Sequence, residues 1–529
     1  MPRILIADAV SEEGAKVLSS PPGFEVDNKP TITPEELLKT IGDYDALVVR
    51  SRTKVTADVL KAGKKLKVVG RAGVGLDNVD IETATHQGII VMNTPGGNTI
   101  STAEHSFAMI CSLARNIAQA DASVKAGKWE KKAFTGIELN GKTLGVVGLG
   151  RIGREVARRA IAFHMRVLGY DPYVMPESVA KDGIECSELD TLFRESDFIT
   201  VHTPVTSETR SLINKETLAK MKKGVRLINC ARGGIIDETD LVEALKSGKA
   251  AGAALDVFEK EPLAADHPLR QCPNVILTPH LGASTAEAQE NVAVEVAEQI
   301  VEALQGKRVR NAANYPSIDP EMLQLLLPYL NLAERLGKFL AQYVEGRTAK
   351  IAVEYSGTVL DFDVSPLTTS VIKGFLEPYV SEPINFVNAL PRARSQGIEV
   401  VESKSSLLYH YVNLITVTTT TEGGRRDSVS GTLFAPTMPR IVVINGKHFD
   451  VVPEGNLIII ENRDVPGIVG NVGTLLGEEM INIAEMTWGR TAPSHDAITA
   501  INVDQEISEN VLRKLRGLPN ILSAKVIKM

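Results

Sequence analysis

The chain has 529 residues, and its 58 Lys and Arg against 65 Asp and Glu give a formal net charge of −7. At about 150 residues per domain, this length predicts three or four domains and excludes peptide hormones, disulfide miniproteins and single binding modules. The slightly acidic balance, with 43% hydrophobic and 23% charged residues, favours neither a nucleic-acid partner nor a membrane partner.

The cysteines and the amino terminus indicate the compartment. Cys111, Cys186, Cys230 and Cys272 lie far apart without a CxxC pair, which fits neither a disulfide framework nor a zinc site. The first apolar run ends at Asp8, too soon for a signal peptide, and predicts a strand. No uninterrupted apolar stretch reaches about 18 residues, the length of a spanning helix. We therefore expect a cytoplasmic protein without a bound metal.

The first 97 residues alternate short β-rich runs with helical segments, which is typical of a parallel sheet covered by helices. The β-rich runs are ILIADAV, ALVVR, LKVVG and IIVMN. The pattern changes at Asn98, where Ser101 and Glu104 are spaced as a capping box before a long helical pattern. A second domain is expected to begin there.

A second alternation predicts a dinucleotide-binding sheet. Six strand candidates follow one another in TLGVVG, MRVLGYD, DFITVH, VRLINC, AGAALDV and NVILTPH. Another capping-box spacing, Ser284 and Glu287, then precedes a helical pattern that Gly306 ends. Long helices flank this second alternation on both sides. We therefore expect a Rossmann-type domain at 98–282, inserted into an α/β substrate domain that is made of residues 1–97 and 283–310.

The last two hundred residues carry no recognisable catalytic motif. Residues 311–452 combine Pro and Gly punctuation with a Thr-rich β segment, which favours an α+β regulatory or assembly domain. From residue 455 to 529 the expected order is β-α-β-β-α-β, a ferredoxin-like unit, with Pro466 and Gly467 opening its first helix.

The strongest motif is GLGRIG, in which Gly148, Gly150 and Gly153 follow an apolar strand and open a helix. Glycines permit the tight turn and a close approach to a pyrophosphate, and the helix amino terminus attracts its charge. Asp171 ends the next predicted strand, where a carboxylate accepts from both ribose hydroxyls and repels a 2′-phosphate. The sequence predicts an NAD site; a glycine turn that only packs is the alternative.

Three polar residues follow strands of the same predicted sheet and are therefore expected to meet at its carboxyl edge. Arg232 precedes a Gly-Gly turn and could hold a carboxylate with its planar fork. His280 is the expected acid/base, and Glu261 could orient its ring. Each alone is as often structural as functional; together with the glycine motif they predict a dehydrogenase.

An anionic substrate is expected because three arginines follow strands of the first domain. Arg50 and Arg52 stand in VVRSRT, and Arg71 stands in GRAGVG. Such side chains could face the cleft between the two domains and bind a phosphoryl group. For any one of them, an exposed surface charge is the alternative.

Five segments together resemble the D-isomer-specific 2-hydroxyacid dehydrogenases. They are VGRAGVGLDNVD, GLGRIG, NCARGGIIDE, DVFEKEP and TPHLGAST. The fold of that family implies a flavodoxin-like substrate domain. The whole chain resembles the long branch of this family, in which an intervening allosteric-substrate-binding domain and an ACT domain follow. That branch implies NAD-linked oxidation of 3-phospho-D-glycerate to 3-phosphohydroxypyruvate, the first committed step of L-serine synthesis.

The resemblance also implies roles for individual positions. Arg232, Glu261 and His280 would be catalytic, and Gly73, Val74 and Asn98 would join Arg50, Arg52 and Arg71 at the substrate. The cofactor positions would be Gly148, Gly150, Arg151, Ile152, Gly153, Asp171, Thr203, Cys230, Ala231, Arg232, Asp256, His280, Leu281, Gly282 and Ala283. In the ACT domain, Asn462, Asp464 and Asn482 would bind L-serine as an effector across a dimer. A homotetramer is expected.

Two alternatives stay open from the sequence. One is a related dehydrogenase that acts on another 2-hydroxy acid, such as glyoxylate or a branched-chain acid. The other is a binding protein that senses NAD or serine without turnover, against which the complete set of Arg232, Glu261 and His280 argues.

Overall fold

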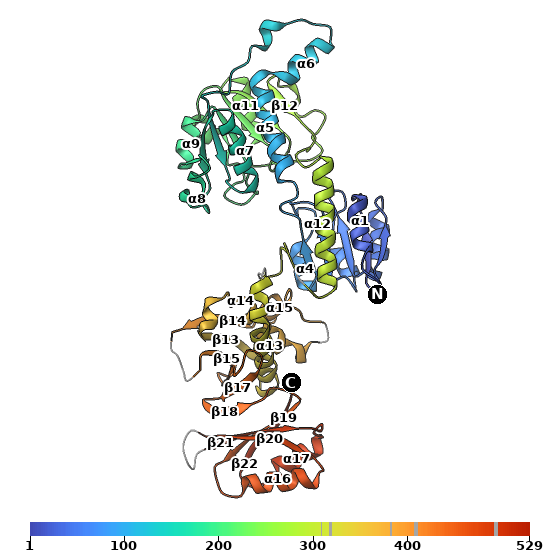
Figure 1. The fold of residues 1–529 in the computed structure, drawn as a ribbon, viewed down its shortest axis with the longest axis vertical. Helices are drawn as coiled ribbons and strands as arrows, with labels where there is room; N and C mark the ends of the chain where they lie inside the picture. The colour runs from blue at the N-terminus through green and yellow to red at the C-terminus, as the bar shows by residue number, and fades with distance from the viewer. Residues whose placement is uncertain (308, 317–319, 381–382, 407–410, 491–495) are drawn as a thin grey trace.

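The computed structural model describes residues 1–529 except 308, 317–319, 381–382, 407–410 and 491–495. Within the described residues the strands form four sheets, which follow one another along the chain. Figure 1 shows these units spread along one long axis, with the second sheet at one end and the fourth at the other. None of the described helices is both long and apolar enough to cross a membrane.

The first sheet is wholly parallel in its described strands and has the order β2-β1-β3-β4-β5, the flavodoxin-like arrangement. Its strands are β1 (Arg3–Ile6), β2 (Glu25–Asn28), β3 (Ala46–Val49), β4 (Val68–Arg71) and β5 (Ile90–Met92). Four helices alternate with them: α1 (Glu12–Ser19), α2 (Pro34–Thr40), α3 (Ala57–Ala62) and α4 (Ile81–Gln87). Except for the edge strand β2, the strands are short apolar runs because helices cover both faces.

One face of this sheet is completed by a helix from far along the chain. Helix α12 (Ala286–Leu304) packs Val292, Val296 and Ile300 against the strands, beside α1. The chain leaves the first sheet through α5 (Thr99–Arg115) and returns to it through α12, as Figure 1 shows. The second sheet therefore lies between these two crossings in the chain.

The second sheet is also parallel in its described part, with the order β12-β11-β10-β9-β6-β7-β8. Counted from β6, strands β6 to β11 have the Rossmann order and β12 is a further strand at one edge; the six expected strands are confirmed. The strands are β6 (Thr143–Val147), β7 (Arg166–Tyr170), β8 (Glu185–Cys186), β9 (Phe198–Val201), β10 (Val225–Asn229), β11 (Ala250–Leu255) and β12 (Val275–Leu277). The accompanying helices are α6 (Ile117–Lys125), α7 (Arg151–Ala162), α8 (Pro176–Ala180), α9 (Leu189–Glu195), α10 (Lys215–Lys220) and α11 (Glu238–Lys246).

Both predicted capping boxes were wrong in detail. Helix α5 begins after Asn98, so Ser101 lies inside it and bonds the Thr285 hydroxyl at 2.9 Å instead. Helix α12 begins one residue later than Ser284 predicts, because the Thr285 side chain accepts from the Ala288 N–H. The boundary residue lies three positions before the expected cap in α5 and one position after it in α12, differences that spacing alone does not resolve.

The third sheet is mixed and has the order β14-β13-β15-β16-β17-β18 in the described residues. Its strands are β13 (Thr348–Gly357), β14 (Glu399–Ser405), β15 (Asn413–Thr421), β16 (Arg426–Leu433), β17 (Pro439–Ile444) and β18 (Lys447–Val451). Helices α13 (Pro320–Tyr343), α14 (Ser365–Leu376) and α15 (Ala389–Ser395) belong to this unit. The expected α+β character is confirmed.

The fourth sheet is antiparallel and has the order β20-β21-β19-β22. The elements are β19 (Asn456–Arg463), α16 (Ile468–Glu478), β20 (Ile483–Arg490), β21 (Asp496–Val503), α17 (Glu509–Arg516) and β22 (Ile521–Lys528). This is the expected β-α-β-β-α-β order, and α16 does begin directly after Pro466 and Gly467.

Candidate active site

The glycine motif joins β6 to α7 at the carboxyl edge of the second sheet. Gly148 has a φ of 95°, and a Cβ there would lie 2.6 Å from the His202 carbonyl oxygen. A Cβ at Gly153 would lie 2.0 Å from the Gly148 oxygen, so helix and turn touch. At Gly150 a Cβ would meet no described atom within 4 Å, which leaves the loop open toward the side where a pyrophosphate would lie.

Asp171 lies beside this loop. Its carboxylate accepts from the Leu149 N–H at 2.9 Å and from the Tyr173 N–H at 2.9 Å. A carboxylate fixed in this way next to the glycine loop suits the ribose of a dinucleotide. Across the same edge, the buried Thr203 hydroxyl has no hydrogen-bond partner among the described atoms. The residues present therefore fit NAD.

The remaining predicted cofactor positions lie along the same edge. Arg151 and Ile152 begin α7, and Cys230 to Arg232 follow β10. The buried Asp256 follows β11, and the segment from His280 to Ala283 follows β12. Because parallel strands end at one edge, all of these positions lie along it, although the Cys230 and Asp256 side chains are buried.

His280 and Glu261 form a pair. The Glu261 Oε2 lies 2.8 Å from the His280 Nδ1, and its Oε1 accepts from the Phe258 N–H at 3.1 Å. The carboxylate is thus held by its own loop and orients the ring, which leaves Nε2 as the free ring nitrogen. Half of the His280 side chain is exposed, at 50%, so a ligand can reach it.

A second histidine at this edge is unsuited to proton transfer. The Nδ1 of His202 is buried, and desolvation lowers the pKa of the ring to about 4. Its Nε2 lies 2.9 Å from the Thr200 hydroxyl, inside the sheet. The ring is therefore neutral near pH 7, and His280 stays the predicted acid/base of this edge.

Arg232 faces the first domain. Its Nε lies 3.3 Å from the Asp77 carboxylate, which belongs to the loop after β4, and its Nη1 donates to the Ala231 oxygen at 2.7 Å. A Cβ at Gly75 would come within 2.1 Å of the Arg232 Nη2, so the backbone closely approaches the guanidinium. Arg232 is in this way placed where the two domains meet.

One cleft of about 760 Å³ joins these groups to the first domain. The predicted residues that line it are Arg50, Arg71, Gly73, Val74, Asn98, Arg232, Glu261, His280 and Ala283. Lys54 and Arg210 also line it, and sequence reasoning missed both. Lys54 could have been found as a cation in the same loop as Arg50, whereas Arg210 comes from a distant loop without a motif.

The structure does not bring Arg52 into this cleft. Its guanidinium donates to the Asp8 carboxylate at 3.0 Å and to the Ala7 oxygen at 2.6 Å. Asp8 is buried and also accepts from the Thr53 hydroxyl. Arg52 therefore stabilises the loops above the first sheet, and Arg50 and Arg71 remain the arginines of this domain that face the cleft.

The cleft is cationic. Burial, and then repulsion by Arg232 and Arg50, lower the pKa of Arg71 to about 10, with Asp77 acting in the opposite direction. Even so, Arg71 is charged near pH 7. Several partly buried guanidinium groups that repel one another are stabilised when an anion binds among them, so the cleft suits a multiply charged anion.

The predicted effector residues are not brought together within one chain. Asn462 is the last residue but one of β19 and accepts from the Thr499 hydroxyl at 3.1 Å, and Asp464, just after the strand, binds Arg490 at 2.9 Å. Asn482 precedes β20 and donates to Asp504 at 2.6 Å. Since β19 and β20 both pair antiparallel with β21, Asn482 lies at the opposite end of the sheet.

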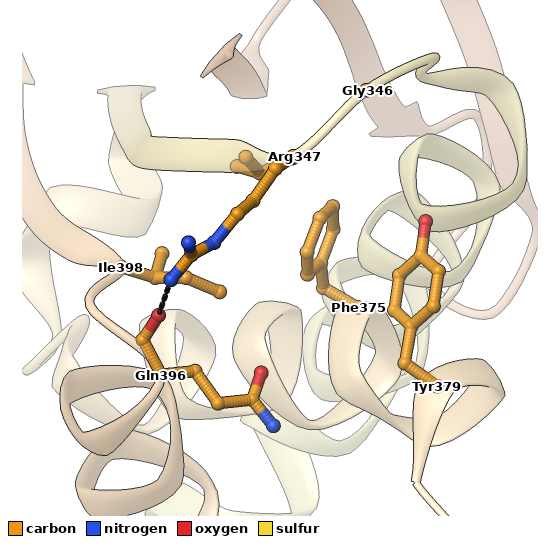
Figure 2. Close-up of a pocket in the computed structure, with 7 residues that line it drawn as sticks. Gly346, Arg347, Phe375, Tyr379, Gln396 and Ile398 are labelled. Carbon is orange, nitrogen blue, oxygen red and sulfur yellow. Dashed lines mark hydrogen bonds between the residues drawn. The ribbon is translucent and has the colours of Figure 1, made fainter. Parts of the chain in front are cut away.

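A further cavity of about 410 Å³ lies in the unit of the third sheet. Figure 2 shows the Arg347 side chain pointing toward Gln396, whose backbone oxygen accepts from the guanidinium at 3.4 Å, with Phe375 and Tyr379 to the other side. Arg347 also lies 3.2 Å from Glu422, so its charge is already balanced. The residues that line this cavity include no histidine or carboxylate that could exchange a proton.

Comparisons with known proteins agree with this geometry. The family model for the D-isomer specific 2-hydroxyacid dehydrogenase NAD-binding domain matches residues 107–282, and the model for the D-3-phosphoglycerate dehydrogenase intervening domain matches residues 325–445. The chain is 46% identical to the D-3-phosphoglycerate dehydrogenase of Archaeoglobus fulgidus over 100% of both chains. It is 45% identical to that of Bacillus subtilis, over 100% of this chain and 99% of the relative.

Solved structures resemble the first two units. A D-lactate dehydrogenase from Aquifex aeolicus, complexed with NAD and lactic acid, is 31% identical with a TM-score of 0.53, covering 60% of this chain and 100% of that one. A glyoxylate reductase from Paecilomyes thermophila is 31% identical with a TM-score of 0.55, covering 59% of this chain and 98% of that one.

Proposed function

Because the chain belongs to the D-3-phosphoglycerate dehydrogenases, NAD-dependent oxidoreductases of the D-isomer-specific 2-hydroxyacid dehydrogenase family, we propose that it oxidises 3-phospho-D-glycerate to 3-phosphohydroxypyruvate. This reaction would be the first committed step of L-serine synthesis in the cytoplasm. The observation that carries the proposal is one cleft in which the His280–Glu261 pair and Arg232 face Arg50 and Arg71. An acid/base, a carboxylate clamp and cations for a phosphoryl group are thus together.

The residues of the cleft have distinct tasks in this proposal. Arg232 binds the substrate carboxylate through its planar fork and orients C2. His280 accepts the proton of the C2 hydroxyl at Nε2 while Glu261, bonded to Nδ1, stabilises the imidazolium that forms. NAD, when bound, accepts the hydride that leaves C2. In the reverse direction the same imidazolium returns its proton to the ketone oxygen.

The test follows NADH absorbance. Purified protein should form NADH with 3-phosphoglycerate and consume it with 3-phosphohydroxypyruvate, and turn over 2-oxoglutarate far more slowly. A preference for unphosphorylated 2-oxo acids would contradict the proposed substrate while leaving the family intact.

The cofactor preference is expected to depend on the charge of Asp171. We expect Asp171→Ala and Asp171→Asn to raise kcat/KM with NADPH relative to NADH by about tenfold, because the repulsion of a 2′-phosphate is lost. Asp171→Asn retains an oxygen that can accept from the Leu149 N–H. This variant therefore tests the loss of the negative charge while the hydrogen bond that holds the loop is kept. An unchanged preference in both variants would remove Asp171 from the ribose site.

Recognition of the phosphoryl group is expected to depend on Arg71. We expect Arg71→Gln to raise KM for 3-phosphohydroxypyruvate about tenfold, because a charge-assisted hydrogen bond is lost, and to leave KM for 2-oxoglutarate unchanged. Arg52→Gln is the matched control from the same sheet edge, since its guanidinium binds Asp8. It should lower Tm without changing either KM, and equal effects of Arg71→Gln on both substrates would contradict the assignment.

The carboxy-terminal units are proposed to regulate this activity. We assign residues 1–97 and 283–310 to the substrate domain, 98–282 to the NAD domain, 311–452 to the intervening domain and 455–529 to an ACT domain. L-serine is proposed to inhibit by binding Asn462 and Asp464 of one chain and Asn482 of a second, within a homotetramer. The separation of these residues in one chain supports a site shared between chains. NADH assays with added L-serine, together with light scattering, test both parts.

A further inference from the structure

The segment that follows His280 is hydrogen-bonded to a buried carboxylate. The backbone N–H groups of Leu281 and Gly282 donate to the two oxygens of Asp256 at 2.7 and 2.8 Å. The Asp256 backbone oxygen also accepts from the His280 N–H at 2.9 Å. His280 itself has a φ of 56°, an uncommon conformation for a residue other than glycine, which such surrounding contacts must maintain.

Two side chains of α5 hold this arrangement from the other side. The His105 Nε2 lies 3.2 Å from the Asp256 Oδ1 and 3.3 Å from the Thr278 hydroxyl. One turn earlier, the Thr102 hydroxyl donates to the Gly282 oxygen at 3.2 Å. Residues 102 and 105 lie on one face of the helix, so α5 contacts both the carboxylate and the segment that the carboxylate holds.

Asp256 needs these donors. Its side chain is fully buried, so water cannot replace a lost partner. Burial alone would raise the pKa of Asp256, but hydrogen bonds from His105, Thr278 and the two backbone N–H groups together hold it below its usual value. The carboxylate is therefore ionised near pH 7 and accepts from all of these donors.

We propose that His105 and Thr102 are positioning residues for the reaction: they hold Asp256 and the Leu281–Gly282 segment so that the His280 ring points into the cleft. The inference rests on the proposed role of His280. Neither side chain lines the cleft, so both act through others. Helix α5 is also the segment that crosses from the first sheet to the second, so the conformation of the His280 loop is coupled to the helix that joins the domains.

The test compares substitutions that keep or remove the donor at position 105. His105→Leu removes the ring N–H. In His105→Gln, the side-chain amide NH₂ of the new Gln can donate in its place. We expect His105→Leu to lower kcat with 3-phosphohydroxypyruvate about thirtyfold, with KM and NADH affinity within about twofold, because a misdirected His280 slows proton transfer more than binding. His105→Gln should restore kcat to within about threefold of the native value, and Thr102→Val should lower kcat several-fold.

Ser106→Ala is the matched control. Ser106 is buried one position further along α5, and its hydroxyl donates to the Thr102 backbone oxygen inside the helix. It should keep the native kcat, and Tm measured for every variant separates folding from positioning. Native kcat in His105→Leu, or equal losses in His105→Leu and His105→Gln, would overturn the inference.

A failure of the proposed substrate can be recognised separately. If the native protein turns over another 2-oxo acid and not 3-phosphohydroxypyruvate, the same variants are compared on that acid. A lower kcat with an unchanged KM in His105→Leu then supports the positioning role, whichever acid is used. An unchanged kcat overturns the positioning role.

Discussion

Replacing His280 with Asn is expected to lower kcat about a thousandfold in both directions, because general acid/base catalysis by a positioned imidazole is lost. Asn is similar in size to part of the ring and can still hydrogen-bond, so the cleft should keep its shape. NADH binding, followed by fluorescence titration, should remain within about twofold, since the glycine loop and Asp171 are proposed to hold the dinucleotide independently of His280. Normal binding with near-normal turnover would show that His280 is not the base.

His267 provides the matched control for this prediction. Its Nε2 pairs with Glu238 at 3.0 Å in the same domain, as His280 pairs with Glu261, but it does not line the cleft. His267→Asn should therefore keep kcat within about twofold, because the His267 ring contacts neither the cleft nor the His280–Glu261 pair, although the loss of this mostly buried ion pair should lower Tm. A comparable loss in both variants would indicate damage to the domain rather than to the reaction.

The sequence predicted those strands that are apolar runs. It missed strands that have little apolar character and are defined only by hydrogen bonds to a neighbouring strand. The six strands of the second sheet were found because parallel strands buried on both faces are apolar throughout. Strands β2, with the sequence EVDN, and β8, with EC, lie at sheet edges and have little apolar character. Hydrogen bonds to β1 and β7 define them, which no local pattern indicates.

In the candidate site, too, the sequence predicted residues placed by strand topology and missed residues placed by packing. Arg232 and His280 could be predicted to meet because each directly follows a parallel strand, and topology then places their side chains at one edge. Loop side chains could not be assigned in this way. Arg52 follows a strand just as Arg50 does, but it turns to Asp8, 44 residues earlier. Arg210 reaches the cleft from a loop whose path depends on packing, and His105 acts through contacts between distant segments.

The second large effect is expected at Arg232. Replacing it with Leu should lower kcat/KM for 3-phosphohydroxypyruvate about a thousandfold, because two charge-assisted hydrogen bonds to the substrate carboxylate are lost together with its orientation. Arg232→Lys keeps the charge but not the planar fork, so about a hundredfold loss is expected there. Steady-state kinetics should show a fall in kcat as well as a rise in KM, since a carboxylate that is bound but rotated reacts slowly.

A control for charge separates this effect from general electrostatics. Arg166→Leu removes one positive charge from the same sheet, but Arg166 begins β7, at the edge opposite to the cleft, and pairs with Glu185 and Glu195. If the cleft acts only as a cationic surface, Arg232→Lys should behave like the native protein. If the fork orients C2, Arg232→Lys should bind the substrate and still turn over slowly. Near-native kcat in Arg232→Lys would therefore leave Arg232 as a source of charge and assign the orientation of the substrate to the first domain.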